Sequence, residues 1–501
     1  MKPLRSLIAN GAVWMLLFKF VERSLGFAST LILVRLLVPA DFGLVAMGTS
    51  LLVMLEYFAG FGMDLALIRH PAPERRHYDT AWTLNVALAV LIAVLMMLAA
   101  YPLAIFYRQP QLTPIVLALS AAALAQGLEN IGTVQFRKEL NFPREFRFQI
   151  TKKIVAFSIT VPVALLFHTY WALVSGLIAG RFAALLLSYL WHPYRPRFSM
   201  EARSELLGFS KWLALSNALH VMRERVSDLV IGRLAGPGPL GLYSLGYEVA
   251  NLPTSELVLP INRATIPGYS LLTGDVARLR AGFLNVIGMI ALLVIPAGLG
   301  IAATALPATQ VLLGKAWLGA VPLIEILAFY GIVTALQANC FPIYIATGRP
   351  DLQTRLNALY LVVLIPSMIL LTQAYGLPGA AISSVATALL MLPINFTLVL
   401  RSVQGSWKQV AAIVWRPLTA ATIMAVCVRS WLGVTDGEAP TWVQLRTLIA
   451  AILLGAIIYA AMLLLLWWLS GRPGGAERFV AERLRGMLRS IRGGLARGMR
   501  P

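Results

Sequence analysis

The sequence predicts an all-α, polytopic membrane protein of about 14 transmembrane helices, built as two six-helix lobes in a parallel repeat plus two extra helices. Three observations support this fold class. Hydrophobic residues make up 58% of the 501 residues and charged residues only 13%, about half the charged fraction of a soluble protein. Apolar runs of bilayer-spanning length, about 20 residues each, recur along the chain. A motif between two such runs occurs twice.

The repeated motif runs from Arg35 to Leu44 and again from Arg233 to Leu242. Its Arg, Leu, Pro and Gly residues keep a constant separation of 198 residues. The same separation relates three further pairs: Trp14 and Trp212, Asp64 and Asn262, and Ile68 and Ile266. One register for so many matches indicates two homologous halves. The Pro and Gly residues predict tight turns between neighbouring helices, and we interpret them as structural.

The predicted spans follow from the apolar runs. Their approximate limits are 11–35, 42–68, 79–104, 112–133, 148–167, 169–191, 209–234, 240–263, 282–306, 319–346, 355–374, 377–400, 411–431 and 445–470. Six spans separate the two copies of the motif, so both copies have the same orientation, as in a parallel repeat about the membrane normal.

The connecting segments alternate in charge. With a cytoplasmic N-terminus, the outer-side segments hold Arg35, Arg108, Arg233, Lys315, Arg429 and Arg446. The inner-side segments hold many more basic residues, namely Arg69, Arg75, Arg76, Arg137, Lys138, Arg144, Arg147, Lys152, Lys153, Arg195, Arg197, Arg203, Lys211, Arg263, Arg278, Arg280, Arg349, Arg355, Arg401 and Lys408. This asymmetry predicts that both termini are cytoplasmic. It also explains the net charge of +20 without nucleic acid.

The same pattern predicts five parts. Residues 1–191 form an N-terminal six-helix lobe, 192–208 an interfacial cytoplasmic linker, 209–408 a C-terminal six-helix lobe and 409–470 two additional helices. Residues 471–501 form a basic amphipathic tail, which is expected to lie on the anionic inner leaflet.

No residues indicate catalysis, a metal or a cofactor. The two cysteines, Cys340 and Cys427, lie in apolar segments and are interpreted as small buried hydrophobic residues. The five histidines are scattered, and no HExxH, GxSxG or phosphate-binding loop occurs. The opening residues do not form a cleavable signal. We therefore expect no enzyme activity, and energy from ion or substrate gradients or from a partner.

Charged residues inside the first and seventh predicted spans are the main candidates for function, because such residues are costly in a bilayer and mark transport paths. The first span carries Lys19, Glu22 and Arg23 on one helix face, and the seventh carries Arg223, Glu224, Arg225 and Asp228. The Glu22-Arg23 and Glu224-Arg225 pairs are one helical turn from repeat-equivalent positions. They predict a hydrated, polar cavity between the lobes. The alternative is an ion-pair network without a ligand.

Further candidates lie in the second and eighth spans, which carry Glu56 and Asp64, and Glu248, Glu256, Asn262 and Arg263. Pro253 and Pro260 predict that the eighth span is kinked or broken. The isolated Glu129 and Arg181 are expected to form helix–helix hydrogen bonds, and Gly176 and Gly180 to permit close helix packing.

Several blocks resemble bacterial polysaccharide exporters and lipopolysaccharide biosynthesis flippases of the multidrug/oligosaccharidyl-lipid/polysaccharide (MOP) superfamily, in its colanic-acid-exporter-like branch. These blocks are 34–44, 136–142, 208–212, 247–257, 260–264 and 348–350. The resemblance covers roughly the first four hundred residues, and the final two spans and the tail are less characteristic.

The resemblance implies a multi-pass protein of the bacterial inner membrane that flips an oligosaccharide linked to undecaprenyl pyrophosphate, by alternating access. Lys19, Arg23, Arg223 and Arg225 are then expected to bind the pyrophosphate. Glu22, Glu224, Asp228, Asp64, Glu248 and Glu256 are expected to orient them or to carry coupling protons. The expected partners are the lipid-linked oligosaccharide, membrane lipids and a polysaccharide polymerase or other export machinery, without nucleic acid or cofactor.

Four other functions stay open at this point. A multidrug or cation antiporter of the same superfamily should have acidic rather than mixed cavity residues. A peptidoglycan-precursor flippase shares the fourteen-span architecture but not the quoted blocks. A membrane glycosyltransferase or polymerase needs acidic catalytic residues in a sizeable outer loop, and no loop here is long enough to house them comfortably. A structural scaffold would not need so many intramembrane charges.

Overall fold

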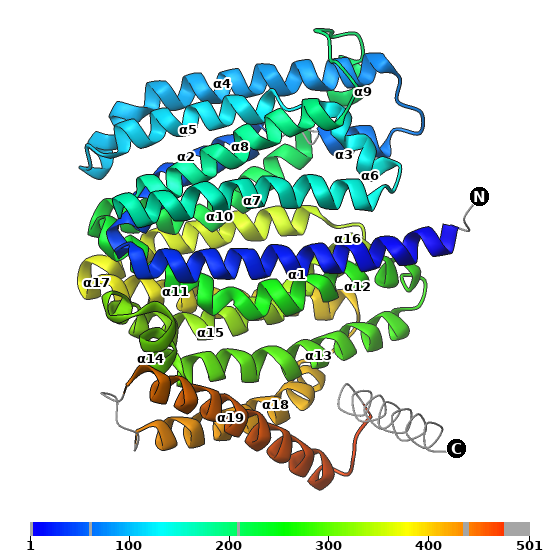
Figure 1. Ribbon diagram of the computed structural model, residues 1–501. Coiled ribbons are helices and arrows are strands. Elements are labelled where there is room, and N and C mark those ends of the chain that lie inside the picture. The colour runs from blue at the N-terminus through cyan, green and yellow to red at the C-terminus, as the bar shows by residue number, and fades with distance from the viewer. Residues whose placement is uncertain (1–3, 60–62, 208–210, 434–439, 475–501) are drawn as a thin grey trace, which may run out of the picture. The chain divides into compact units, whose positions relative to one another are not determined.

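The computed structural model describes residues 4–59, 63–207, 211–433 and 440–474, which contain helices and no β-strand (Figure 1). The chain divides into two compact units, Met1–Ser244 and Leu245–Pro501. The boundary falls inside helix α11 (Pro237–Pro253).

The first unit contains seven long helices that match predicted spans, namely α1, α2, α4, α5, α7, α8 and α10, together with short connecting helices. Their bounds are α1 (Leu4–Leu36), α2 (Pro39–Ala59), α3 (Met63–Arg69), α4 (Arg75–Tyr107), α5 (Leu112–Gly127), η1 (Ile131–Thr133), α6 (Val134–Lys138), α7 (Phe142–Phe167), α8 (Trp171–Trp191), α9 (Arg203–Leu207) and α10 (Lys211–Ala235). Between α5 and α6 the chain bends by 61°.

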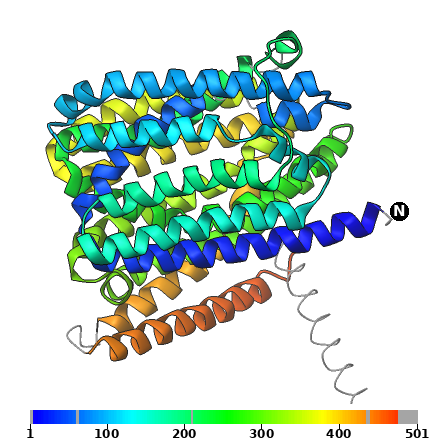
Figure 2. The ribbon, with the colours of Figure 1, turned by 45° about the horizontal axis from the view of Figure 1, so that its top comes forward.

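Helices α1, α7, α8, α5 and α4 pack in that order, each beside the next, and α2 packs on α5 (Figures 1 and 2). Small residues permit the close approach. A Cβ on Gly176 of α8 would lie 1.7 Å from Thr160 Oγ1 of α7, and one on Gly127 of α5 would lie 2.1 Å from Ala89 Cβ of α4. The predicted close packing at Gly176 is therefore confirmed.

The segment after α8 is fastened to the first two turns of α4. Asp79 accepts hydrogen bonds from the Tyr194 hydroxyl (2.5 Å) and the Arg197 amide (2.8 Å). Farther along, the Ser199 amide donates to Thr83 Oγ1 at 3.0 Å. The ring of Phe198 packs on Trp82, with centroids 5.0 Å apart. Two aromatic residues of the predicted linker, Tyr194 and Phe198, thus contact α4.

The second unit continues α11 and contains the remaining helices. Their bounds are η2 (Thr254–Val258), α12 (Leu259–Leu271), α13 (Val276–Ala303), α14 (Ala305–Ala308), η3 (Thr309–Leu313), η4 (Lys315–Ala320), α15 (Val321–Ala338), α16 (Cys340–Ala346), α17 (Asp351–Ser402), α18 (Trp407–Leu432) and α19 (Thr441–Leu469). The element η2 is a π-helical turn between Pro253 and Pro260. The α-helical pattern is therefore interrupted where the sequence predicts a kink or a break, but the chain stays helical. Helix α17 comprises two helices joined at Gly376, whose φ of 63° and ψ of −145° are not helical.

The core of the second unit lies where α13 packs against α15 and α18, around Phe283, Ile287 and Ile290, which are fully buried. Two polar contacts attach the last helices to this core. Arg429 of α18 pairs with Glu325 of α15 at 3.2 Å, and the Tyr459 hydroxyl of α19 donates to the Leu292 carbonyl at 2.8 Å.

Each predicted span is helical for most of its described length, but the predicted ends differ from the observed ones by up to about eight residues, as at the end of α12 (Leu271). For example, α1 begins at Leu4 and α4 at Arg75. Nine helices in the described ranges are long and apolar enough to cross a membrane, and a tenth if α5 and α6 count as one broken span. A count of fourteen and the five-part division stay predictions. The basic tail lies almost entirely outside the described residues.

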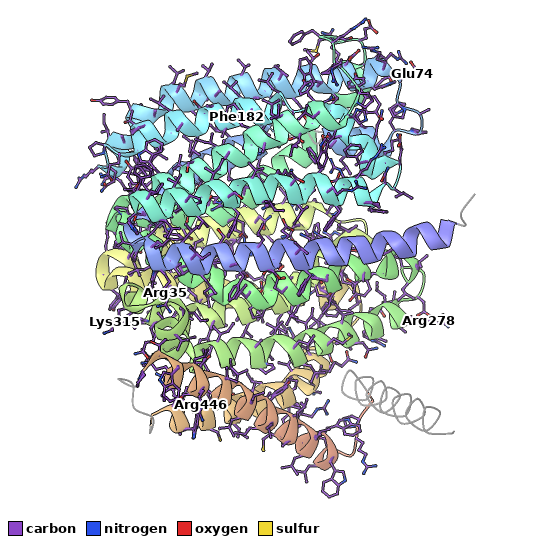
Figure 3. The ribbon with its side chains drawn as sticks, in the orientation of Figure 1. Arg35, Glu74, Phe182, Arg278, Lys315 and Arg446 are labelled. Carbon is purple, nitrogen blue, oxygen red and sulfur yellow. The ribbon has the colours of Figure 1, made fainter. Side chains whose placement is uncertain are left out.

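Figure 3 shows where the labelled charges lie within each unit. In the first unit Arg35 and Glu74 lie at opposite ends of the helices, and in the second unit Arg278 lies opposite Lys315 and Arg446 (Figure 3). Exposed apolar side chains such as Phe182 cover the length between these ends. The arrangement agrees with the predicted alternation of charged segments, whereas the side that faces the cytoplasm stays a prediction.

Candidate functional site

The charged residues of α1 contact α7. Lys19 Nζ lies 3.0 Å from Glu22 Oε2, and Lys153 Nζ of α7 lies 3.7 Å from Glu22 Oε1. The Glu22 side chain is three-quarters buried, whereas Lys19 and the neighbouring Arg23 are exposed. Glu22 therefore lies between two lysines, and it can hold the α1 cluster in one orientation.

Helix α10 carries a more deeply buried pair. Arg225 Nη1 lies 3.3 Å from Asp228 Oδ2, and Asp228 is only 7% exposed. One turn farther on, a Cβ on Gly232 would lie 2.7 Å from the ring of Tyr107 in α4. A carboxylate this buried needs its cation, so Asp228 fixes the position of Arg225. Arg223 and Glu224 on the same helix are partly buried.

The packing assigns the two charged clusters to different neighbours. Helix α1 packs along α7, whereas α10 packs along α2. The predicted convergence of Lys19, Arg23, Arg223 and Arg225 on one ligand stays a prediction.

A second group of charges lies inside the first unit, where the sequence indicated isolated residues. Arg181 Nη2 of α8 contacts both carboxylate oxygens of Glu56 in α2, at 3.2 and 3.3 Å. The helix–helix hydrogen bond expected for Arg181 is confirmed. Nearby, Arg137 of α6 pairs with Asp64 of α3 at 2.6 Å. Glu129 and Lys152 lie within electrostatic range of Arg181.

Asp64 and its repeat equivalent Asn262 have similar roles in their own units. Asn262 Nδ2 of α12 donates to the Ala338 carbonyl at the end of α15, at 3.1 Å. Glu248 and Glu256 are exposed in the second unit, and Ser255 Oγ lies 3.1 Å from Glu256 Oε1. The role predicted for Asp64, Glu248 and Glu256, to orient the basic residues or to carry coupling protons, stays a prediction.

The two copies of the repeated turn contact each other within the first unit. A Cβ on Gly43 would lie 1.8 Å from the Pro237 carbonyl oxygen, and one on Gly241 would lie 1.9 Å from the Pro39 carbonyl oxygen. Each copy thus places a proline carbonyl against the glycine of the other. The structural role predicted for these turns agrees with this reciprocal contact.

Substituting Ala for Gly43 or Gly241 should destabilise the protein by about 1–3 kcal/mol, the usual cost of overpacking, because a backbone carbonyl cannot move aside cheaply. Gly238→Ala is the matched control, because a Cβ there has no neighbour within 4 Å. Thermal unfolding in detergent measures the effect. Equal melting temperatures for all three variants would contradict the reciprocal contact.

Comparison with known proteins decides the family. A family model described as "Polysaccharide biosynthesis protein" matches residues 32–322, more than half of the chain. This chain belongs to that family.

Two relatives of this chain are described as polysaccharide biosynthesis or transport proteins. The chain is 25% identical to the succinoglycan biosynthesis transport protein ExoT of Rhizobium meliloti, over 96% of each chain. It is 23% identical to the lipopolysaccharide biosynthesis protein WzxC of Escherichia coli, over 83% of this chain and 85% of WzxC.

Two solved structures share the fold. The lipid II flippase MurJ in an inward closed conformation matches with a TM-score of 0.73 and 13% identity, over 91% of this chain and 99% of MurJ. An inward-facing multidrug resistance MATE family transporter of the MOP superfamily matches with a TM-score of 0.59 and 15% identity, over 76% of this chain and 95% of the transporter. The predicted polytopic helical fold is thus confirmed. The match of the family model likewise confirms the resemblance to polysaccharide biosynthesis proteins.

Two polar features of this family member were not predicted from its sequence. The pairing of Arg181 with Glu56 was not predicted, although both residues were noted, because 125 residues separate them. In the second unit Gln337, Tyr344 and Asn395 form a network in which Asn395 Nδ2 donates to Gln337 Oε1 at 2.9 Å. Neutral amides inside apolar helices were the signal that could have revealed it.

Proposed function

We propose that the protein flips an oligosaccharide linked to undecaprenyl pyrophosphate across the bacterial inner membrane, by alternating access and with both termini in the cytoplasm. Family membership together with basic residues inside two helices of an otherwise apolar bundle carries this proposal. Lys19, Arg23, Arg223 and Arg225 bind the pyrophosphate, because cationic side chains neutralise its charge away from bulk water. The lipid tail stays in the bilayer.

The acidic residues keep these cations in place. Glu22 contacts Lys19 and Lys153, and Asp228 contacts Arg225. Without these carboxylates, release of the pyrophosphate would leave the basic side chains unpaired in a low-dielectric environment, where their mutual repulsion is unfavourable. Glu224 has the same function on α10, and Asp64, Glu248 and Glu256 support the helices or carry coupling protons.

Deleting the gene should cause one lipid-linked oligosaccharide to accumulate on the inner leaflet and should stop the appearance of its glycan at the cell surface. Mass spectrometry of extracted lipids and enzymatic access to the glycan in inverted and right-side-out vesicles measure both effects. Restoring the intact gene is the control. Accumulation of lipid II instead would favour a peptidoglycan-precursor flippase, and no accumulated lipid would contradict flipping.

A further inference from the structure

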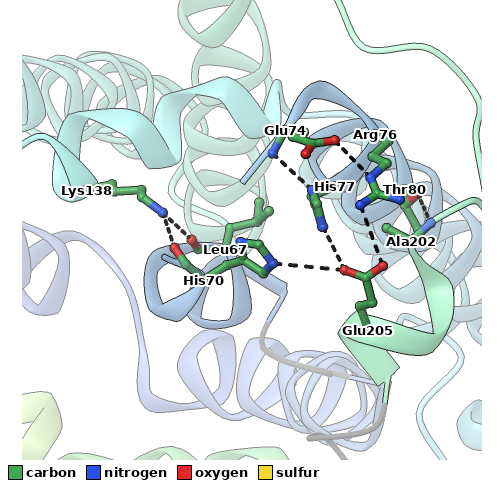
Figure 4. Close-up of polar contacts among 9 residues, drawn as sticks. All are labelled: Leu67, His70, Glu74, Arg76, His77, Thr80, Lys138, Ala202 and Glu205. Carbon is green, nitrogen blue, oxygen red and sulfur yellow. Dashed lines mark hydrogen bonds and ion pairs between the residues drawn. The ribbon is translucent and has the colours of Figure 1, made fainter. Parts of the chain in front are cut away.

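A cluster of two histidines and one glutamate lies outside the predicted spans, at the end of the first unit where α3, α4 and α9 meet (Figure 4). Its members are His70, His77 and Glu205. One ring nitrogen of each histidine and one carboxylate oxygen of Glu205 all lie within 4.8 Å of one another. His77 Nε2 is 3.0 Å and His70 Nε2 4.0 Å from the same Glu205 oxygen. The two rings lie side by side with centroids 4.3 Å apart.

Each of the three residues is held by contacts of its own. Lys138 Nζ donates to the carbonyl oxygens of Leu67 and His70, which fixes the end of α3. His77 belongs to the capping box of α4 with Glu74. The Ala202 amide donates to Thr80 Oγ1 at 3.2 Å, which places α9 and with it Glu205. The ligand atoms are therefore brought together by the fold, as a binding site requires.

The cluster is polar but incompletely satisfied. His70 Nδ1 is buried and has no hydrogen-bond partner among the described residues. Its Nε2 is too far from Glu205 for a hydrogen bond. Arg76 Nη2 lies 3.9 Å from the other oxygen of Glu205, which is also too long for a hydrogen bond. Two imidazoles turned toward one carboxylate are a ligand set that a divalent transition metal binds well.

We propose that His70, His77 and Glu205 bind a divalent transition-metal ion of the zinc class. A small contraction of the cluster brings its three ligand atoms to metal–ligand distances of about 2.0–2.2 Å. The side chains of His70 and Glu205 are 30% and 44% exposed, so the ion can enter from solvent and keep a water molecule as its fourth ligand. The ion cross-links the segment after α8 to the corner between α3 and α4.

Binding requires one rearrangement at His77. The Glu74 amide now donates to His77 Nδ1 at 3.0 Å, so the neutral ring carries its proton on Nε2. A metal on Nε2 moves that proton to Nδ1 and breaks this hydrogen bond. One cap hydrogen bond is a small loss compared with three metal–ligand bonds.

The test uses the full-length protein in detergent, stripped of metal and without a polyhistidine tag. Competition with a chromophoric chelator measures Zn²⁺ affinity and stoichiometry. We expect one tightly bound ion, a raised melting temperature with Zn²⁺, and affinity at least about tenfold weaker in His70→Gln and Glu205→Gln. His168→Gln, which alters an exposed histidine at the C-terminal end of α7, should bind as wild type does.

The result has three informative outcomes. Loss of affinity in both ligand variants with unchanged melting temperature in the absence of metal supports the site. An absence of stoichiometric binding by the wild type overturns it. Equal affinity in wild type, His70→Gln and Glu205→Gln also overturns it, because the ion would then bind elsewhere. None of these outcomes depends on which lipid the protein moves.

Discussion

Reversing the charges of Arg23 and Arg225 together, as Arg23→Glu with Arg225→Glu, is expected to abolish surface glycan export. Each change replaces a cation proposed to bind pyrophosphate with an anion that repels it. Arg225→Glu also places a second carboxylate beside Asp228, which pairs with Arg225 at 3.3 Å in the wild type. Surface glycan per cell, normalised to the amount of protein in the membrane, measures the effect.

Two further variants separate loss of binding from loss of folding. Arg23→Lys with Arg225→Lys keeps the positive charges but not the guanidinium geometry, so it should retain part of the export activity. Arg278→Glu alters an arginine whose side chain is 78% exposed and which pairs with Asp275, the N-cap of its own helix, so export should be unaffected. Wild-type export by the doubly reversed protein, at normal abundance, would reject the proposed pyrophosphate site.

Replacing Arg181 with Leu should lower the free energy of unfolding by about 3 kcal/mol, because it leaves the largely buried Glu56 carboxylate without its cation. The double variant Glu56→Leu with Arg181→Leu should recover most of this loss, since an apolar pair carries no desolvation cost. Thermal unfolding of the three purified proteins measures both values. The exposed pair of Arg278 and Asp275 is the control, and Arg278→Ala should cost about 0–1 kcal/mol.

Transport by the double variant then distinguishes two roles for this ion pair. A stable double variant that still exports glycan indicates that Glu56 and Arg181 only join α2 to α8. A stable double variant that no longer exports glycan adds the pair to the transport path. If Arg181→Leu were as stable as the wild type, the ion pair would not be needed to compensate the buried charge.

The sequence predicted those features that depend on local pattern. Apolar runs predicted where the helices lie. Pro253 and Pro260 predicted an irregularity where the π-helical turn η2 is found, and Gly176 predicted a close contact between α7 and α8. The ends of the helices were predicted less accurately than their positions. Apolar residues mark the part of a helix that faces lipid and do not mark its polar first and last turns. This is why α4 extends before and after its predicted span.

Features that depend on long-range partners could not be predicted from spacing. Nothing near Glu56 in the sequence indicates Arg181, and nothing near His77 indicates Glu205, which is 128 residues away. His70 and His77 form a ligand cluster only together with Glu205, and the segment after α8 must pack on α4 to bring Glu205 to them. The convergence of the charges on α1 and α10 also depends on tertiary packing and stays a prediction.

The reciprocal contact between Pro39, Gly43, Pro237 and Gly241 has a consequence for how the two halves of the gene can change. Each glycine leaves room for a proline carbonyl of the other copy. A larger residue at either glycine would therefore displace the turn of the other copy as well. The size of the residue at position 43 and at position 241 is therefore limited by the same pair of contacting turns.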